Sequence, residues 1–122
     1  MSIKELLTRI INALKVDYIV EEGTSSIWTY RKWNSGIAEC WGTYSKSINA
    51  NTTDLANYIN YPFTFTSTPC IAIGLMAGGA DLYKAHIELS STNATQVRLV
   101  MMNAYSSAVT MKVNIYAIGR WK

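Results

Sequence analysis

The first residues of the chain carry apolar side chains at a helical spacing. Ile3, Leu7, Ile10 and Leu14 are separated by four, three and four positions, which is the spacing of the a and d positions of a coiled coil. Ser2, with Glu5 three positions later, matches the capping box that begins a helix. The pattern therefore predicts a helix over residues 2–16.

This helix needs a covering surface, because an isolated helix of its length is marginal in water. It could pack on its own domain, or it could form a short parallel coiled coil. Isoleucine-rich core positions favour three strands over two. We favour a trimeric stem over residues 1–17, followed by a head domain over residues 18–122.

The rest of the chain is typical of β structure. Residues 49–61 are polar with little pattern, and they predict a loop with a helical turn near Asp54 to Tyr58. The sequence Asn34-Ser35-Gly36 is a hairpin-turn signal. About seven strands separated by turn residues indicate a mainly β, antiparallel sandwich of six to seven strands. The β-prone segments from which these strands are drawn cover residues 18–20, 27–33, 37–45, 63–66, 70–76, 83–89, 97–102 and 111–118.

Composition narrows the class of protein. Hydrophobic residues make up 49% of the chain, which excludes a disordered chain. Charged residues make up only 16%, against about 25% in typical domains, so part of the surface is expected to be hidden in an oligomer. The net charge of +3 is scattered without a basic run, so we expect no nucleic-acid partner.

No apolar run approaches the roughly 20 residues of a membrane span, so we expect no membrane insertion. Glu5 and Arg9 interrupt the first apolar stretch, which argues against a secretory signal. We therefore expect synthesis in a cytoplasm. Cys40 and Cys70 are 30 positions apart, and we expect them to be reduced, buried residues rather than a disulfide.

The sequence offers little for catalysis. His86 is the only histidine, and no nucleophile-elbow motif surrounds a serine. A metal site needs three or four convergent ligands, so neither a metal nor a cofactor is expected. An acidic pair for glycoside cleavage would have to come from Glu39, Asp54, Asp81 and Glu88. We expect that the protein is not an enzyme and keep a glycan hydrolase as a minor alternative.

Aromatic residues are the unusual feature of the composition. Four Trp and eight Tyr accompany only two Phe, and Tyr and Trp suit both interfaces and sugar-binding surfaces. Alternatively, Trp33 and Trp41 are core residues or cross-strand pairs. Alternation puts residues 28, 30 and 32 on one face of their strand and residues 27, 29 and 31 on the other. Both faces are mixed, which suggests that one contacts another subunit.

Three motifs carry a resemblance to a known family. They are WTYRKWNSGIAECWG at residues 28–42, YPFTFTSTP at residues 61–69 and AIGRWK at residues 117–122. In this order they resemble the C-terminal domains of tail-fibre and minor tail proteins of phages and prophages. The second half also resembles the H-type lectin fold, an antiparallel sandwich that trimerises.

The resemblance implies a homotrimeric fibre tip in the virion, made in a bacterial cytoplasm and bound to other virion tail proteins. It implies that the tip recognises a host cell-surface carbohydrate, where three identical weak sites gain avidity. As ligand residues we select those in or beside loops at the ends of the predicted sandwich. The selected residues are Tyr58, Tyr61, Asp81, Tyr83 and Tyr105.

An alternative function is a structural module that trimerises and caps the fibre without binding a ligand.

Overall fold

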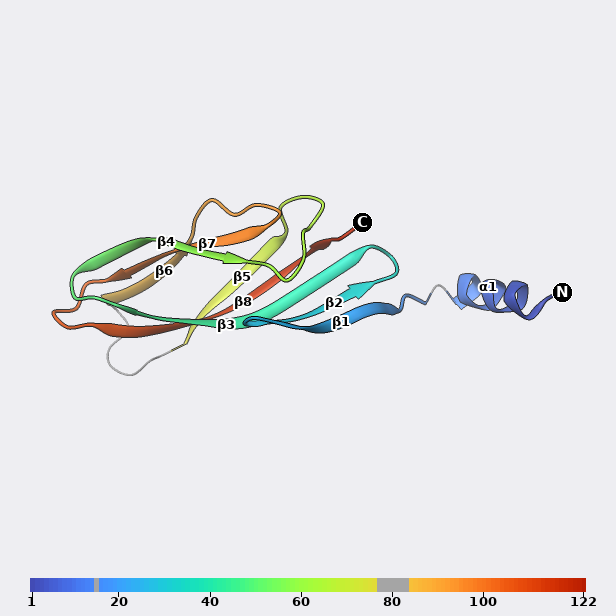
Figure 1. Cartoon of the computed structure of the whole chain (residues 1–122), viewed down its shortest axis with the longest axis horizontal. Coiled ribbons are helices and arrows are strands. Elements are labelled where there is room, and N and C mark those ends of the chain that lie inside the picture. The colour runs from blue at the N-terminus through green and yellow to red at the C-terminus, as the bar shows by residue number, and fades with distance from the viewer. Residues whose placement is uncertain (15, 77–83) are drawn as a thin grey trace.

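The structure is a computed structural model that describes residues 1–14, 16–76 and 84–122. One helix, α1 (Ile3–Leu14), precedes eight strands within this part of the chain (Figure 1). The strands are β1 (Ile19–Ser25), β2 (Trp28–Trp33), β3 (Ile37–Ile48), β4 (Thr52–Asn60), β5 (Cys70–Met76), β6 (Ala85–Leu89), β7 (Gln96–Asn103) and β8 (Val109–Arg120).

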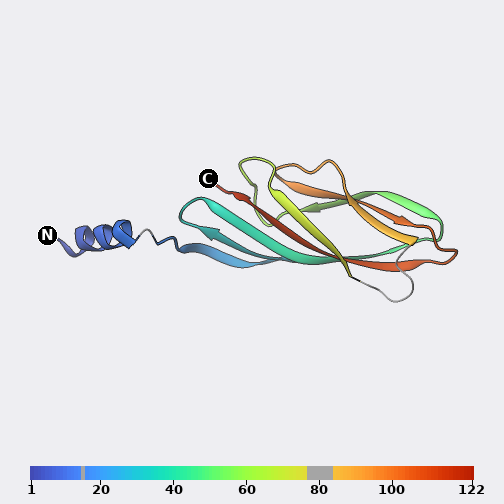
Figure 2. The same ribbon diagram turned by 180° about the vertical axis from the view of Figure 1, so that it is seen from behind.

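Helix α1 begins with the predicted capping box. The Ser2 hydroxyl accepts a hydrogen bond from the Glu5 amide over 3.1 Å, and the Glu5 carboxylate accepts one from the Ser2 amide over 3.0 Å. The helix extends beyond one end of the strands in two views half a turn apart (Figures 1 and 2). Its side chains from residue 3 to residue 13 are exposed, Ile10 to 45%. The structure therefore does not show the helix packed on the sheets of its own chain.

The strands form two antiparallel layers, as the sequence predicts. Sheet A has five strands in the order β1-β2-β3-β8-β5, and sheet B has three in the order β4-β7-β6. Every strand pairing is antiparallel. No helix in the described ranges is long and apolar enough to cross a membrane.

The core lies between the two sheets and follows the alternation of the strands. In β7, Val97, Leu99 and Met101 are buried, and the residues between them are partly exposed. In β8, Met111, Val113 and Ile115 are buried in the same alternating way. Each large apolar side chain buried in this way contributes about 1.5–3 kcal/mol, so alternation fixes which face of each strand turns inward.

Residues 49–61 correct the prediction of a loop with a helical turn. They contain β4, which pairs with β7 from Thr52 to Asn60 with a register shift between Asp54 and Asn57. The Asp54 carboxylate accepts a hydrogen bond from the Ala56 amide over 3.0 Å, which bends the backbone locally. This β-bulge breaks the alternation on which the sequence prediction depended.

The expected strand at residues 63–66 is also wrong. Its backbone forms single hydrogen bonds with two different segments, from Phe65 to Ala94 and from Thr66 to Arg120, instead of a ladder. Pro62 and Pro69 flank the segment and have no amide hydrogen to donate. The rings of Phe63 and Phe65 contact each other and pack on the core, so the alternation reflects packing of a loop.

Both cysteines are free, and only one is buried. Cys40 lies in the core, as expected. Cys70 is exposed because it begins the edge strand β5 and lies opposite the exposed Ile118 of β8. The expectation that both thiols are buried is therefore wrong for Cys70.

Candidate functional site

The end of the head opposite α1 is built around one buried amide. This end, the distal tip, contains the β3–β4 connection and the β7–β8 connection (Figures 1 and 2). The Asn103 side chain donates hydrogen bonds to the carbonyl oxygens of Ile48, Asn49 and Ser107 over 3.0–3.1 Å. It accepts one from the Tyr105 amide over 2.9 Å. Both connections are therefore held in a fixed position relative to β7.

A shallow depression of about 350 Å³ lies beside this anchor. The Ala104 amide donates a hydrogen bond to the Lys84 carbonyl oxygen, and the Asn51 amide donates one to the Tyr105 carbonyl oxygen, both over 2.9 Å. The Lys84 ammonium lies 5.7 Å from the centre of the Tyr105 ring. This tip depression is lined by Asn51, Thr53, Lys84, His86, Met102, Asn103 and Ala104.

The tip depression offers the chemistry of a small polar ligand site. Amide, hydroxyl and ammonium groups can bond to hydroxyl groups of a ligand, while Met102 supplies an apolar surface. No group of three or more His, Cys, Asp or Glu residues within the described ranges could hold a metal ion. Polar side chains beside an apolar one suit binding of a small polar molecule.

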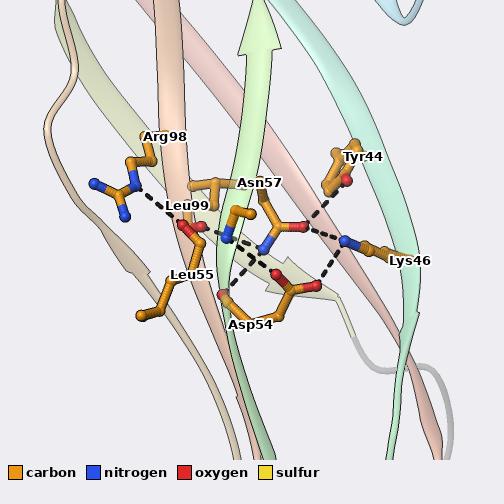
Figure 3. Close-up of polar contacts among 8 residues, drawn as sticks. Tyr44, Lys46, Asp54, Leu55, Asn57, Arg98 and Leu99 are labelled. Carbon is orange, nitrogen blue, oxygen red and sulfur yellow. Dashed lines mark hydrogen bonds and ion pairs between the residues drawn. The ribbon is translucent and has the colours of Figure 1, made fainter.

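A second feature of the outer face of sheet B is an exposed tyrosine platform, formed by Tyr58, Arg98 and Leu55. Tyr58 is 53% exposed and lies opposite Arg98 on the neighbouring strand. The Arg98 guanidinium lies 5.1 Å from the centre of the Tyr58 ring. It also donates a hydrogen bond to the Leu55 carbonyl oxygen over 3.0 Å (Figure 3). Tyr58 therefore presents an aromatic surface next to a positioned cation.

The β4 bulge holds this platform from the inner side of sheet B. The Asn57 amide is 1% exposed and donates hydrogen bonds to the Asp54 and Leu99 carbonyl oxygens over 3.1 and 3.3 Å. Its oxygen accepts hydrogen bonds from the Tyr44 hydroxyl and the Lys46 ammonium (Figure 3). All hydrogen-bonding positions of this buried amide are therefore occupied, which fixes the bulge.

An ion pair completes the network below the platform. The Lys46 ammonium lies 2.6 Å from the Asp54 carboxylate. The hydrogen bond from Lys46, followed by that from the Ala56 amide, lowers the pKa of Asp54 below its usual value. The same contact with Asp54 raises the pKa of Lys46. The ion pair joins β3 of sheet A to β4 of sheet B, so the platform is tied to both layers.

The platform and the tip depression share one face of sheet B. Arg98 and Met102 are four residues apart on β7, so they point to the same side, about 14 Å apart. Thr53 and His86 lie opposite Met102 on the two neighbouring strands. An extended ligand that spans this distance can therefore contact both.

Three of the five residues selected from the sequence lie in the described chain. Tyr58 is on the platform, and Tyr105 is beside the tip depression. Tyr61 is only 7% exposed, because it packs between Trp28 and Phe65 in the core, so its selection as a ligand residue is wrong. Asp81 and Tyr83 lie outside the described residues.

Sequence reasoning missed Arg98 and Leu55 on the platform, and Thr53, Lys84, His86 and Met102 at the tip. The alternation of β7 was a usable signal for Arg98 and Met102, because their neighbours Val97, Leu99 and Met101 are clear core residues. The pairing of Arg98 with Tyr58 needed the register of β4, which the bulge concealed.

The three family motifs meet at the stem end of the head rather than at the distal tip. The Trp121 indole donates a hydrogen bond to the Trp33 carbonyl oxygen over 2.9 Å, and the Arg120 guanidinium donates one to the Ser35 carbonyl oxygen over 2.8 Å. The Lys32 ammonium lies 5.2 Å from the Phe63 ring and 5.3 Å from the Trp121 ring. These contacts hold the C-terminal residues, the β2–β3 turn and the segment at 61–69 together at the end of the strands opposite the tip depression.

The junction with the helix is attached to the same cluster. The Asp17 carboxylate accepts hydrogen bonds from the amide and the hydroxyl of Ser35, and these bonds lower its pKa. Gly36 has a φ of 100°, a conformation that glycine adopts without strain. Its amide bonds to the Trp33 carbonyl oxygen over 3.0 Å, which confirms the predicted hairpin turn.

Comparison with solved structures shows the fold. An N-truncated R1-type pyocin tail fibre is 14% identical, with a TM-score of 0.68 over 92% of this chain and 94% of that chain. A C-terminal fragment of the R1 pyocin fibre of P. aeruginosa is 13% identical, with a TM-score of 0.67 over 89% of this chain and 30% of that chain. The corresponding R2 fibre is 12% identical, with a TM-score of 0.53 over 87% and 28%.

The chain therefore has the fold of a tail-fibre C-terminal domain, as the motifs predicted. No family model matches the sequence. No curated protein matches it either. The resemblance to H-type lectins stays a prediction.

Proposed function

We propose that the chain is the receptor-binding tip of a phage or prophage tail fibre. In this proposal it is part of the virion, is bound to other tail proteins, and works as a homotrimer joined through α1. Its distal tip and the outer face of sheet B bind a host cell-surface carbohydrate, without a catalytic step. The observation that carries the proposal is the tail-fibre fold with a ligand-sized depression, lined by both polar and apolar groups, at the end opposite the helix.

The helix and the tip depression lie at opposite ends of the molecule, which supports the proposal that the tip faces the host cell. Helix α1 projects from one end of the strands (Figures 1 and 2). Its side chains are exposed, and the tip depression lies at the other end. A fibre that continues through the helix would present the distal tip outward. The ligand surface would then face the host cell, and the motif-rich end would face the stem.

The chemistry of this surface supports a carbohydrate ligand. Sugars are recognised by aromatic rings that stack on their C–H faces and by amides and hydroxyls that bond to their hydroxyl groups. Tyr58 supplies an exposed ring, Tyr105 lies partly buried beside the depression, and Asn51 and Thr53 supply the polar groups. Three copies on one stem would multiply a weak affinity by two or more orders of magnitude.

The test is binding of the purified chain to an array of bacterial surface polysaccharides. We expect binding to at least one polysaccharide, with a loss of tenfold or more in Tyr58→Ala and in Thr53→Ala. Thr64→Ala is the matched control, because Thr64 is an exposed threonine in the connection between β4 and β5, outside both sheets, and it should leave binding unchanged.

Three results would overturn the assignment. A trimer that binds no polysaccharide would favour a structural capping module. Binding that survives both the Tyr58 and the Thr53 substitution would place the ligand elsewhere. Release of reducing sugar from a bound polysaccharide would favour the glycan hydrolase instead.

A further inference from the structure

The outer face of sheet A carries large apolar side chains on neighbouring strands. Trp41 of β3 lies opposite Tyr116 of β8, and Ile118 lies opposite Cys70 of β5. Tyr116 and Ile118 are 37% and 36% exposed. Trp41 separates two shallow depressions of about 410 and 360 Å³. The opposite face of this sheet is covered by sheet B, so this is its open face.

The charges at the centre of this face are already paired with one another. The Arg31 guanidinium lies 2.8 Å from the Glu39 carboxylate, whose other oxygen accepts a hydrogen bond from the Tyr116 hydroxyl. The guanidinium also lies 4.9 Å from the centre of a Trp41 ring. A partner that covers this face would therefore bury two charges that already neutralise each other. This avoids the large cost of burying an unpaired ion.

This internal pairing favours an identical copy as the partner. In a rotationally symmetric assembly, copies bring the same residues together around one axis, so an unpaired charge near the axis would repel its counterparts. The Arg31–Glu39 pair has no net charge. The outer face of sheet B has no comparable pairing within the described residues, since Arg98 bonds to a backbone carbonyl there.

The edge of this face is made of small residues. Cys70, Ala72 and Gly74 alternate along β5 on the side of Ile118, Tyr116 and Asn114. A side chain built at Gly74 would meet no atom within 4 Å. Small side chains at an edge allow a second backbone to approach closely.

The length of the connection to the helix brings this sheet close to any shared stem. Leu14 ends α1 and Ile19 begins β1, the edge strand of sheet A. Five residue steps span at most about 18 Å. When the helices of several copies associate, their sheets A must therefore begin beside the stem.

We propose that the outer face of sheet A is covered by second copies of this chain, with the three faces turned toward a common three-fold axis. The proposal rests on the proposed homotrimer and adds the surface that closes it. It assigns sheet A to assembly and leaves sheet B open for the ligand.

The chain contains its own probe for this interface. Cys70 is exposed in a single copy, and it lies on the proposed interface. Cys40 is fully buried, and burial raises the pKa of its thiol to about 12, so it does not react in the folded protein. The rate of labelling of the native protein with a maleimide therefore reports Cys70 alone.

We expect Cys70 in the assembled protein to react at least tenfold more slowly than the thiols of the urea-unfolded chain. A trimeric mass with Cys70 reacting as fast as an unfolded thiol would overturn this interface and leave the trimer intact. A monomeric mass would overturn the trimer and this interface together.

A pair of substitutions tests the same surface without a label. Ala72→Arg places a long charged side chain on the exposed side of β5, and we expect folded protein, by circular dichroism, that has lost its trimeric mass. Val100→Arg is the matched control on the outer face of sheet B, and it should stay trimeric. A trimeric Ala72→Arg variant would overturn the proposal.

Discussion

The indole nitrogen of Trp121 donates a hydrogen bond to the carbonyl oxygen of Trp33 over 2.9 Å, joining residues 88 positions apart. The Trp121 amide also bonds to the Gly36 carbonyl oxygen over 2.9 Å. The last residues of the chain are therefore attached to the turn between β2 and β3. The segments at residues 28–42 and 117–122 therefore form one structural unit.

This unit predicts a stability effect at the C-terminus. Trp121→Phe keeps the ring packing and removes the donor, and should lower the free energy of unfolding by about 1 kcal/mol. Trp121→Ala also removes the packing against Lys32 and the core, and should cost about 2–3 kcal/mol. Urea unfolding measures both. Equal stability of the wild type and the two variants would show that the tail is not part of the folded unit.

The buried amide of Asn57 gives a second prediction. Asn57→Ala leaves the Leu99 carbonyl oxygen, the Tyr44 hydroxyl and the Lys46 ammonium without one partner each. The expected loss is about 1–3 kcal/mol in the free energy of unfolding, because buried polar groups without partners are costly. Asn12→Ala, at an exposed position of α1, is the control. A loss below about 0.5 kcal/mol would mean that water replaces the amide.

The ion pair at the bulge predicts a dependence on pH. The pKa of Asp54 is lowered in the folded state, first by the hydrogen bond from Lys46. Its contribution to stability is therefore complete above its unfolded pKa of about 3.9 and is lost as the pH falls through the lower folded pKa. Asp54→Asn should be less stable than the wild type near neutral pH, and the difference should vanish in acid.

Urea midpoints of both proteins at about pH 7 and about pH 3 measure this effect. Glu88→Gln is the matched control, because Glu88 forms no ion pair with another residue in the described ranges. A difference between wild type and Asp54→Asn that stays constant with pH would contradict the assigned role of the charge.

The exposed helix gives a prediction on assembly. Ile10→Asp places a carboxylate in the proposed seam of the stem and should shift the mass in solution from trimer toward monomer. Asn12→Asp adds the same charge two residues later, outside the seam positions at 3, 7, 10 and 14, and should stay trimeric. Light scattering of both variants measures the effect. A trimeric Ile10→Asp protein would show that the β head assembles without the stem.

The parts of the fold that depend on alternation could be predicted from the sequence. Strands β7 and β8 bury every second residue, and the turn at Gly36 has the residues that its conformation requires. Strand β4 could not be predicted, because the Asp54 side chain bonds to the Ala56 amide and shifts the register. A strand at residues 63–66 and the observed loop both bring Phe63 and Phe65 to the same side. The alternation of apolar and polar residues therefore did not distinguish a strand from a loop.

The candidate site was predictable only in part. Tyr58 and Tyr105 were selected as aromatic residues near loops; the structure places Tyr58 exposed within β4 and Tyr105 partly buried against the core beside the tip depression. The same reasoning selected Tyr61, which is buried by contacts with Trp28 and Phe65 from distant segments. Such contacts depend on how the sheets stack, and a single sequence does not encode them in any local pattern.

The mass of the purified wild-type chain in solution tests the central claim most directly. Sedimentation equilibrium at micromolar concentration should give about three times the chain mass of 13.6 kDa. A single species at 13.6 kDa would contradict the account, because the exposed apolar residues of α1 and the open face of sheet A would then have no partner.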